Sequence, residues 1–337
     1  MGVGLSACDA PEQTPGPIVT SNRLDGSNEA AVSPRADGFV YTIDVGLRLE
    51  AAAIRGDRAS WLALRSLAER VVRNDDADPW TRGMVAWRWK DGTMPDASGT
   101  TEALRIASGL WRGAESFSQP DARTLALTVL DGYATHARED RDIWFIANYF
   151  NFGTRALATN SFVVDYDPDL LMAVLQSPVD GSARFSDIAA RSCSLVRSAH
   201  TRSGLAYDIV QPEVTTLTPD GPAVFSPNDI VQINNAATVA ERAIHCDPAL
   251  ANSVLTFVRG REDDLRVAYL GRTGDVASAV EAGPDTWAVL ARLALRSGDH
   301  DSARRYAAKV GNPTDVYARG EVALTDAYLA GFHPMSR

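Results

Sequence analysis

The sequence has little of what several large protein classes require. Lysine occurs only twice, at Lys90 and Lys309, and 43 acidic residues outnumber 33 basic ones, which gives a formal net charge of −10. A general nucleic-acid-binding protein would show a basic domain or stripe, so no nucleic-acid partner is expected. No apolar run reaches the roughly 18 residues that a membrane-spanning helix needs. With 337 residues, 45% of them hydrophobic, the chain has the composition of a globular protein.

Sequence signatures of several enzyme classes are also missing. The chain has no CxxC motif, no HExxH motif and no Cys/His cluster at zinc spacing. It lacks the GxSxG elbow of α/β-hydrolases, a Walker loop, and a GxGxxG motif after a strand. The five histidines are scattered and are expected at helix ends or on the surface. No metal and no cofactor is therefore predicted.

The three cysteines are not expected to form a disulfide framework. Cys193 lies in the helical stretch SDIAARSCSLVRSA and is interpreted as a buried packing residue, and Cys246 has no cysteine near it in the sequence. Cys8 has another context, because LSAC (5–8) resembles a bacterial lipobox, whose cysteine is lipidated after signal cleavage. Only seven residues precede it, without a basic or a full apolar region. Either the start codon is placed too late, or the match is accidental.

The chain is predicted to have three parts. Residues 1–8 form the truncated signal-like segment, and residues 9–38 form a flexible linker rich in Pro, Ser, Gly and Asn. Residues 39–331 form a single domain. This organisation predicts an exported protein in the periplasm or at the cell surface, anchored through Cys8 and otherwise free of the membrane. A monomer is expected.

From residue 39 onward, apolar residues recur at helical spacing. Helices are predicted over 39–56, 58–73, 100–117, 121–137, 168–176, 185–200, 229–245, 248–258, 262–281, 285–297, 299–309 and 315–331. Strand-like alternation is limited to short pieces near 143–150 and 205–217. About twelve helices in six hairpins predict an all-α fold, an (α/α)6 toroid. The alternative is an open solenoid, since 285–310 resembles one tetratricopeptide unit, but no clear second copy recurs.

The loop before the helix at residue 100 has two interpretations. Ser98, Thr100 and Thr101 are typical of helix caps, with Glu102 in the first turn near the positive end of the helix dipole. Alternatively, this loop lies at a glycan-binding cleft. Aromatic rings present apolar faces to the C–H groups of pyranose rings, and carboxylates accept hydrogen bonds from hydroxyl groups.

Aromatic residues near this loop are candidates for sugar contact. Trp87 and Trp89 could form a stacking platform beside the carboxylates. In the aromatic segment IWFIANYFNF (143–152), Tyr149 and Asn151 could line the cleft, although the segment could equally be core.

Four stretches follow one another in an informative order. They are YTIDVGLRLEAAAIRGD (41–57), WKDGTMPDASGTTEALRIASGLW (89–111), GLAYDIV (204–210) and SPNDIVQINNAA (226–237). In order and spacing they resemble the motifs of the family-8 glycoside hydrolases, bacterial endoglucanases and related enzymes. The resemblance extends from residue 39 to about 245. It implies an (α/α)6 barrel and activity on a polysaccharide.

Several positions agree with the family's motifs. In the second stretch, the residues in step with the family are Asp96, Ser98, Ile106, Ala107 and Trp111. Asp208 and Asp229 fall at the family's two later aspartates. Tyr166 lies where the family has a Pro-Ser-Tyr segment, and is a candidate for ligand contact.

Other positions depart from the motifs at the catalytic residues. The family's general-acid glutamate falls on or beside Ile43, and Asp44 is the nearest carboxylate. The family's paired aspartates fall on Thr101 and Ala103, with Glu102 between them. The segment around Asp229 also departs, with Asn228 before the aspartate and Gln232 where the family has arginine.

The remaining carboxylates could still hydrolyse a glycoside with inversion. Such an enzyme needs one protonated carboxyl for the leaving oxygen and one ionised carboxylate for water, about 6.5–9.5 Å apart. Asp44 is predicted as the acid and Asp229 as the base, and Glu102 as a third carboxylate of the catalytic site that contacts sugar. For Asp229 the alternative is an N-cap of the helix that follows it.

The predicted function is therefore an exported, endo-acting inverting glycoside hydrolase whose partner is an oligo- or polysaccharide. Its predicted substrate-binding residues are Asp96, Asp208, Trp87, Trp89, Tyr149 and Tyr166. One alternative is a non-catalytic glycan-binding lipoprotein with a degenerate cleft. Another is a further (α/α)6 activity, such as a polysaccharide lyase or an epimerase.

Overall fold

The computed structural model describes most of the predicted domain. The described residues are 32–73, 78–90, 97–140, 142–177, 181–211, 217–218, 221–222, 225 and 228–331. Cys8, the lipobox-like segment, most of the predicted linker and Asp96 lie outside them. Within the described residues, no helix combines the length and the apolar character that crossing a lipid bilayer requires.

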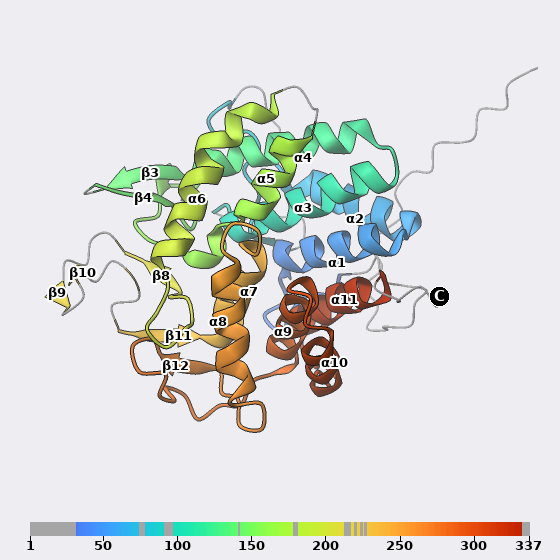
Figure 1. Cartoon of the computed structure of the whole chain (residues 1–337). Helices are drawn as coiled ribbons and strands as arrows, with labels where there is room; N and C mark the ends of the chain where they lie inside the picture. Colours follow the sequence, from blue (N-terminus) through green and yellow to red (C-terminus); the bar gives the residue numbers. More distant parts are fainter. Residues whose placement is uncertain are drawn as a thin grey trace, which may run out of the picture.

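Helices dominate the fold (Figure 1). The described residues form eleven α-helices and two short 3₁₀-helices: α1 (Thr42–Arg55), α2 (Arg58–Val71), α3 (Thr100–Ser116), α4 (Pro120–Ala134), η1 (Val163–Asp165), α5 (Pro168–Gln176), η2 (Ser182–Phe185), α6 (Ser186–Ser198), α7 (Ile233–Arg242), α8 (Pro248–Arg259), α9 (Pro284–Arg296), α10 (His300–Lys309) and α11 (Val316–Gly331). The all-α prediction is confirmed, and the helix at 168–176 matches its predicted bounds.

The helix predicted over 262–281 is wrong. This stretch contains the short strand β12 (Ala268–Leu270), and Gly274 follows in a left-handed conformation with φ of 75°. A right-handed helix cannot continue through a residue with this φ, so the chain turns at Gly274. The helix predicted over 229–245 starts too early. Strand β11 (Ile230–Gln232) occupies the first of these residues and pairs with β12, and α7 begins after it.

The helices form a closed ring of inner helices with outer helices around it. Helices α7, α9, α11, α1 and α3 pack in that order, and η1 lies between α3 and α7. The outer helices are α2, α4, α6, α8 and α10. Each carries the chain back to the end of the ring where the next inner segment begins. The inner helices therefore run in the same direction. We call the end where they begin the N-terminal end of the toroid, and the other the C-terminal end.

The inner helices α1 and α3 approach each other closely at two glycines. A Cβ on Gly46 would lie 2.6 Å from the Cβ of Arg105, and one on Gly109 would lie 2.8 Å from Cγ of Leu49. Trp61 of α2 donates its indole N–H to the Gly109 carbonyl at 3.0 Å. Larger side chains at these glycines would separate α1 from α3 and open the ring.

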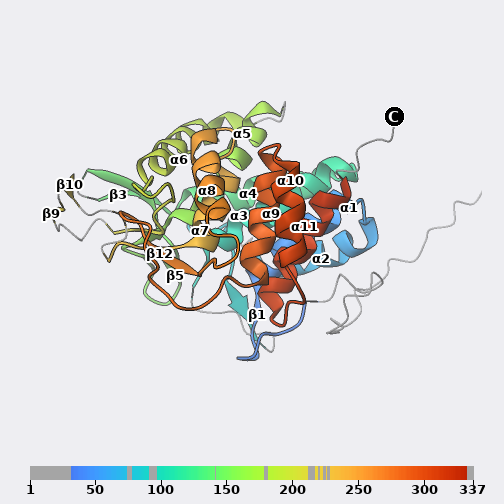
Figure 2. The same ribbon diagram turned by 60° about the horizontal axis from the view of Figure 1, so that its bottom comes forward.

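Strands are short and occur in antiparallel pairs. In the described residues they are β1 (Val40–Tyr41) with β2 (Arg88–Trp89), β3 (Ala137–Asp140) with β4 (Ile143–Ile146), β5 (Phe150–Asn151) with β6 (Ala156–Leu157), β7 (Ser161–Phe162) with β8 (Ile209–Val210), β9 (Leu217–Thr218) with β10 (Gly221–Pro222), and β11 with β12. Strands β1 and β11 lead directly into inner helices, so they lie at the N-terminal end. In Figure 2, β1, β5 and β12 lie on the lower side of the molecule, below the helices.

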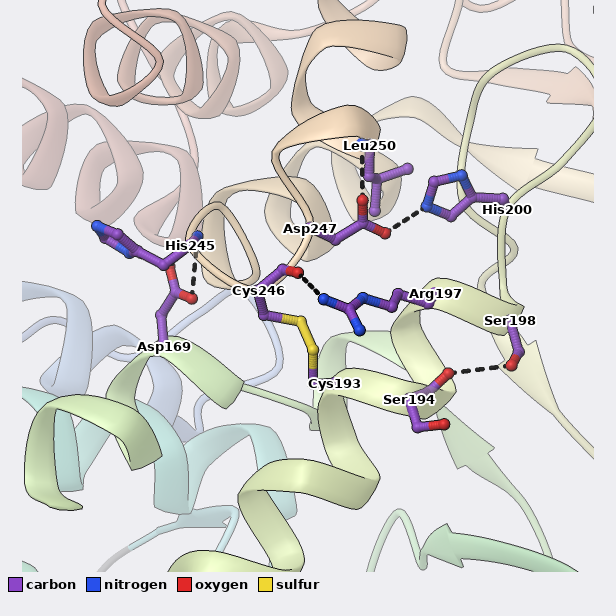
Figure 3. Close-up of a disulfide and its surroundings, with 10 residues drawn as sticks. All are labelled: Asp169, Cys193, Ser194, Arg197, Ser198, His200, His245, Cys246, Asp247 and Leu250. Atoms are coloured by element: carbon purple, nitrogen blue, oxygen red, sulfur yellow. Dashed lines mark hydrogen bonds and ion pairs between the residues drawn. A yellow bond between two sulfur atoms is a disulfide. The ribbon is translucent and has the colours of Figure 1, made fainter.

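A disulfide joins two outer parts of the ring (Figure 3). Cys193 of α6 and Cys246, after α7, are bonded with 5.9 Å between their Cα atoms. This corrects the prediction that Cys193 is only a packing residue and that the cysteines are unpaired. Fifty-three residues separate the two cysteines, and only the ring brings them together. Arg197 donates to the carbonyl of Cys246 at 2.6 Å beside the bond.

Candidate active site

Carboxyl groups gather at the N-terminal end of the toroid. Asp44 and Glu102 are each the third residue of an inner helix, and Asp165 ends η1 between α3 and α7. The charges of Asp165 and Asp44 both raise the pKa of Glu102, which places these three carboxyls in one electrostatic neighbourhood. The parallel direction of the inner helices brings them there from distant parts of the sequence.

A cavity of about 350 Å³ opens beside Glu102. Its lining includes Trp87, Ser98, Glu102, Asn148, Tyr149 and Asn151. The cavity thus combines aromatic rings, amide groups and one carboxyl, which is the composition that binds sugars. Trp87 and Tyr149, two of the residues predicted to contact sugar, both line this cavity.

Glu102 has the pKa of a group that can donate a proton near neutral pH. Burial raises its pKa from 4.5 to about 7, although its own backbone N–H lowers it in part. Among the described residues, no lysine or arginine forms an ion pair with Glu102. Gly99 leaves room for this carboxyl, because a Cβ there would lie 2.0 Å from Glu102 Oε2.

Asp44 is in a different environment. Its side chain is fully buried and accepts two hydrogen bonds from Arg35, at 2.9 Å from Nε and 2.8 Å from Nη2. Burial raises the pKa of Asp44, and the hydrogen bond and charge of Arg35 act against it. Arg35 also lies over the Tyr41 ring, 4.0 Å from its centre. The Asp44 carboxyl is therefore held by a cation and has no exposed surface.

Asp229 lies directly before β11, four positions before the start of α7. Its φ is 59°, and its carboxylate accepts from the Tyr207 hydroxyl at 3.1 Å and pairs with Arg272 Nε at 3.2 Å. The Arg272 backbone N–H also donates to it at 3.2 Å. The N-cap of α7 is Gln232, so the interpretation of Asp229 as an N-cap is wrong. One guanidinium, one hydroxyl and one backbone N–H thus hold the Asp229 carboxylate in place.

Asp208 lies next to Tyr207 and is buried. It accepts from the Gln232 backbone N–H at 2.7 Å, while its own carbonyl accepts from the Val163 N–H at 2.7 Å. Burial raises its pKa to about 7. Asp208 therefore joins β8, β11 and the start of η1. The two predicted aspartates, Asp208 and Asp229, lie in adjoining segments, as Asp44 and Glu102 do.

The sequence analysis missed Asp165. It is fully buried and accepts hydrogen bonds from Thr101 Oγ1 at 2.5 Å and from the Phe162 N–H at 2.9 Å. Burial raises its pKa to about 6. Thr101 thus binds Asp165 rather than capping α3, whose N-cap is Gly99 without a side-chain bond. The only sequence signal was the aspartate-rich run DYDPDLL at 165–171.

The helix-capping prediction for the other two polar residues is also wrong. Thr100 is the first residue of α3 and donates to the carbonyl of Asn148. Ser98 is paired with the buried His136, with 2.8 Å between Oγ and Nε2, and accepts from the Phe150 N–H at 2.9 Å. These bonds tie the start of α3 to the segment that carries Tyr149.

Two predicted aromatic contacts lie away from the cavity. Tyr166 is fully buried, and its hydroxyl accepts from the Ile146 N–H at 2.9 Å, so it is a core residue with no surface for a ligand. Trp89 is half-buried in β2 and packs against the core. Trp80, in contrast, is 55% exposed and rests on Phe150, with ring centres 5.1 Å apart. Sequence reasoning gave no reason to select Trp80.

Comparison with known proteins shows the fold. No family model matches the chain, and no curated protein matches it in sequence. Solved structures do match. An α-amylase from Clostridium perfringens has a TM-score of 0.70 at 15% identity over 88% of each chain. An endo-β-1,4-glucanase from Acetobacter xylinum has 0.64 at 17% identity, over 90% of this chain and 93% of that one.

A cold-adapted family 8 xylanase, solved with its substrate, is also similar. Its TM-score is 0.67 at 14% identity, over 89% of this chain and 81% of the xylanase. At such identities the similarity establishes the architecture. The predicted (α/α)6 toroid and its resemblance to the family-8 glycoside hydrolase fold are confirmed.

Proposed function

We propose that the protein hydrolyses glycosidic bonds within a polysaccharide, with Glu102 as the proton donor. The observation that carries this proposal is a carboxyl with a pKa of about 7 at the wall of a cavity that also holds Trp87 and Tyr149. A general acid works best when its pKa lies near the operating pH. The similar solved structures, which include an endoglucanase and a xylanase with its substrate, support the same class of reaction.

Glu102 suits the role of acid better than Asp44, the sequence-based candidate. Protonating a leaving oxygen requires a carboxyl that reaches the ligand and keeps its proton. Asp44 has no exposed surface, and Arg35 donates two hydrogen bonds to its carboxylate. In this proposal the Asp44–Arg35 ion pair supports the part of the site behind Glu102 and does not contact the sugar.

Asp229 remains the proposed base. A general base accepts a proton from the attacking water, and Arg272 and Tyr207 hold the Asp229 carboxylate in one orientation. Inversion additionally requires the acid and base carboxyls to lie about 6.5–9.5 Å apart with the sugar between them. Asp208, with its raised pKa and buried position, orients the segment that carries Tyr207.

A second candidate is glycan binding without turnover. Ile43 stands where the resembled family has its acid, and Arg35 neutralises the nearest carboxylate. If Glu102 does not donate a proton, the cavity would still bind sugars through Trp87 and Tyr149. This candidate predicts affinity for oligosaccharides with no new reducing ends.

Release of reducing ends from a polysaccharide panel separates these candidates. Glu102→Gln keeps the size and polarity of the side chain but removes the proton, so turnover should fall about 10²–10⁴-fold. Oligosaccharide binding, measured by calorimetry, should change little. Asp44→Asn serves as the matched control, because it neutralises the other candidate acid. If Asp44→Asn abolishes turnover and Glu102→Gln retains it, then Asp44 is the acid and this assignment is wrong.

We also propose that the protein is exported and anchored through Cys8. The disulfide supports export, because such bonds persist in oxidising compartments and are rare in the cytosol. The lipobox-like LSAC stretch and the linker composition support the anchor. Expression from the native locus with Cys8→Ser should move the protein from the membrane fraction to the soluble periplasmic or medium fraction. An unlipidated cytoplasmic native protein would contradict both points.

A further inference from the structure

A second cavity lies beside the segment that holds Asp229. It has a volume of about 470 Å³, and its lining includes Arg202, Ser203, Ser253, Thr256, Arg261 and Thr273. It is bounded by α8, by the turn at 202–204 and by the turn at 272–274. No Asp or Glu is among the described residues that line it. In a chain of net charge −10, this cavity offers two guanidinium groups and several hydroxyls.

The acidic residues nearest Arg261 in the sequence are engaged elsewhere. Glu262 accepts from Arg305 at 3.2 Å, Asp264 pairs with Arg266, and Asp263 lies 3.7 Å from Lys309 Nζ. Arg261 itself forms no ion pair within the described part of the chain. Its guanidinium lies 3.8 Å from the centre of the Phe257 ring, and Nη1 donates to the Phe257 carbonyl at 3.1 Å. The cation is thus positioned by a ring and a carbonyl, without a carboxylate partner.

The walls of this cavity are built before any ligand arrives. Gly274 has a φ of 75°, and a Cβ there would lie 3.1 Å from the Phe257 ring and 3.2 Å from Ser203 Cβ. The Ser203 N–H donates to the Gly271 carbonyl at 3.1 Å, which fixes one turn against the other. The two turns are thus bonded to each other, and Gly274 lies against the Phe257 ring of α8.

The same turn connects the cavity to Asp229. The Gly271 N–H donates to the Asp229 carbonyl at 2.7 Å, and Arg272 pairs with the Asp229 carboxylate. The next residues, Thr273 and Gly274, line the cavity. A polysaccharide bound at Asp229 would therefore lie beside the turn that forms one wall of this cavity.

We propose that this cavity, which we call the arginine cavity, binds an oxyanion carried by the glycan, so that the substrate is an acidic polysaccharide. Guanidinium groups and hydroxyls recognise carboxylate, sulfate and phosphate oxygens through charge-assisted hydrogen bonds. A uronate carboxylate and a sulfate or phosphate ester share this chemistry. The inference rests on the proposed function, because Asp229 and its base role place the glycan here.

Binding to polymers that differ only in charge tests this proposal. The probes are carboxymethyl cellulose, cellulose sulfate and neutral hydroxyethyl cellulose, with dextran sulfate and dextran as a second backbone pair. The full chain should bind at least one anionic polymer about tenfold more tightly than its neutral counterpart, as expected for one charge-assisted contact. Tighter binding of the sulfated or of the carboxymethylated polymer identifies which oxyanion the arginine cavity recognises. Equal binding within both sets, or no binding of any anionic polymer, overturns the proposal.

Arginine variants test whether the preference for anionic polymers arises from the arginine cavity. Arg261→Gln should remove most of the preference, and Arg202→Gln, an exposed position, should remove part of it. Arg304→Gln is the matched control, because it makes the same charge change at a side chain 73% exposed on α10. Thermal unfolding verifies that each variant is folded. A loss of preference in Arg304→Gln as large as in Arg202→Gln would contradict the site.

The two proposals fail separately. Anion preference is measured as binding, and it should persist in Glu102→Gln, which blocks turnover. Unchanged turnover in Glu102→Gln would refute the assigned acid and leave the anion preference standing. A native protein that cleaves neutral and anionic polymers equally well, with equal affinity, would refute the anion site and leave the hydrolase standing.

Discussion

Two glutamates of the inner ring have opposite pKa shifts. The pKa of Glu102 at the N-terminal end is raised to about 7, whereas that of Glu241 toward the C-terminal end of α7 is lowered to about 2. Burial raises the pKa of both. The difference is the partner, because Arg292 donates to both Glu241 oxygens at 3.0 Å, and no described cation pairs with Glu102.

Arginine–glutamate pairs fill the ring toward its C-terminal end. Arg292 is fully buried and also donates to Glu321 at 2.7 Å and to Thr325 at 2.9 Å. Arg105 pairs with Glu50 at 3.3 Å in the same region. The disulfide lies just beyond the end of α7, so this end also has a covalent link. Arg292 donates through Nε, Nη1 and Nη2, and these bonds connect α9 to α7 and α11.

The comparison shows that buried carboxyl groups have two roles in this protein. Some hold helices together, and others are candidates for proton transfer. At the C-terminal end, arginines pair with Glu50 and Glu241 and lower the pKa of both carboxyls. At the N-terminal end, no described cation forms an ion pair with Glu102 or Asp165, and burial raises their pKa values to about 7 and about 6. Buried groups with perturbed pKa values in a cavity are candidates for catalysis. The predictions below test this division, beginning with the largest effect.

Removing Arg292 should have the largest effect on stability. Arg292→Met leaves Glu241 and Glu321 buried without their main cation, so the free energy of unfolding should fall by about 3–5 kcal/mol. Urea unfolding followed by circular dichroism measures the change. Arg304→Met, at an exposed arginine, is the control and should change stability by less than about 0.5 kcal/mol. A loss below 1 kcal/mol in Arg292→Met would show that the network does not hold this end together.

Removing the disulfide should have the next largest effect. Cys193→Ser with Cys246→Ser removes a link between positions 53 apart in the sequence, and the chain-entropy account gives a loss of about 4 kcal/mol. Urea unfolding in the presence and absence of a reductant measures the same quantity in the native chain. The reductant should leave the double variant unchanged. If the reductant leaves the native chain unchanged as well, the link does not contribute to this end.

The pH dependence of stability should have opposite signs at the two ends. The pKa of Glu102 is raised from 4.5 to about 7, so the folded state holds a proton that the unfolded state releases, and stability falls as pH rises from about 4.5 to 7. Glu102→Gln should remove that decline and be more stable than the native chain by about 1–2 kcal/mol at pH 7.

Glu241→Gln is the matched variant at the other end. Because the pKa of Glu241 is lowered to about 2, its contribution is complete above about pH 4.5 and is lost as pH falls toward 2. Glu241→Gln should therefore be less stable than the native chain at pH 7, with a difference that shrinks in acid. Unfolding curves from pH 3 to 8 test both variants. Parallel pH profiles for the two variants would contradict the assigned difference.

The smallest change in stability is expected at the exposed rim of the N-terminal end. Trp80→Ala removes a ring that is 55% exposed, and stability should fall by about 1 kcal/mol through its contact with Phe150. If Trp80 extends the sugar-binding surface, affinity for long oligosaccharides should fall several-fold while turnover of short ones persists. Calorimetry with oligosaccharides of increasing length measures this. Leu62→Ala, at an exposed apolar residue of α2, is the control.

Most helices could be predicted because their signals are local. Apolar spacing and proline at the first turn placed α4, α5 and α9 within a residue or two at their starts. The stretch 262–281 misled the prediction because its apolar residues belong to a strand and turns. Their partner, β11, lies about 40 residues earlier, and no local pattern reports such a pairing.

The candidate site was predicted in part. Glu102, Trp87 and Tyr149 were selected as carboxylate and aromatic residues near a helix start, and they line one cavity. Asp44 was selected for its position beside the family's acid, but the sequence could not show that Arg35 binds it. Tyr166 was selected by resemblance and is core. In each case the residue type was visible, and its partner and exposure were not.

The sequence by itself determined the helical periodicity, the order of the motifs and therefore the toroid, because these depend on spacing along the chain. The tertiary structure alone decided which carboxyls are paired. Glu102 and Glu241 are the same side chain on inner helices, and the pKa of each depends on whether an arginine from another helix reaches it. The disulfide between Cys193 and Cys246 and the arginine cavity beside Asp229 have the same origin. Both arise from contacts between segments that only the closed ring brings together.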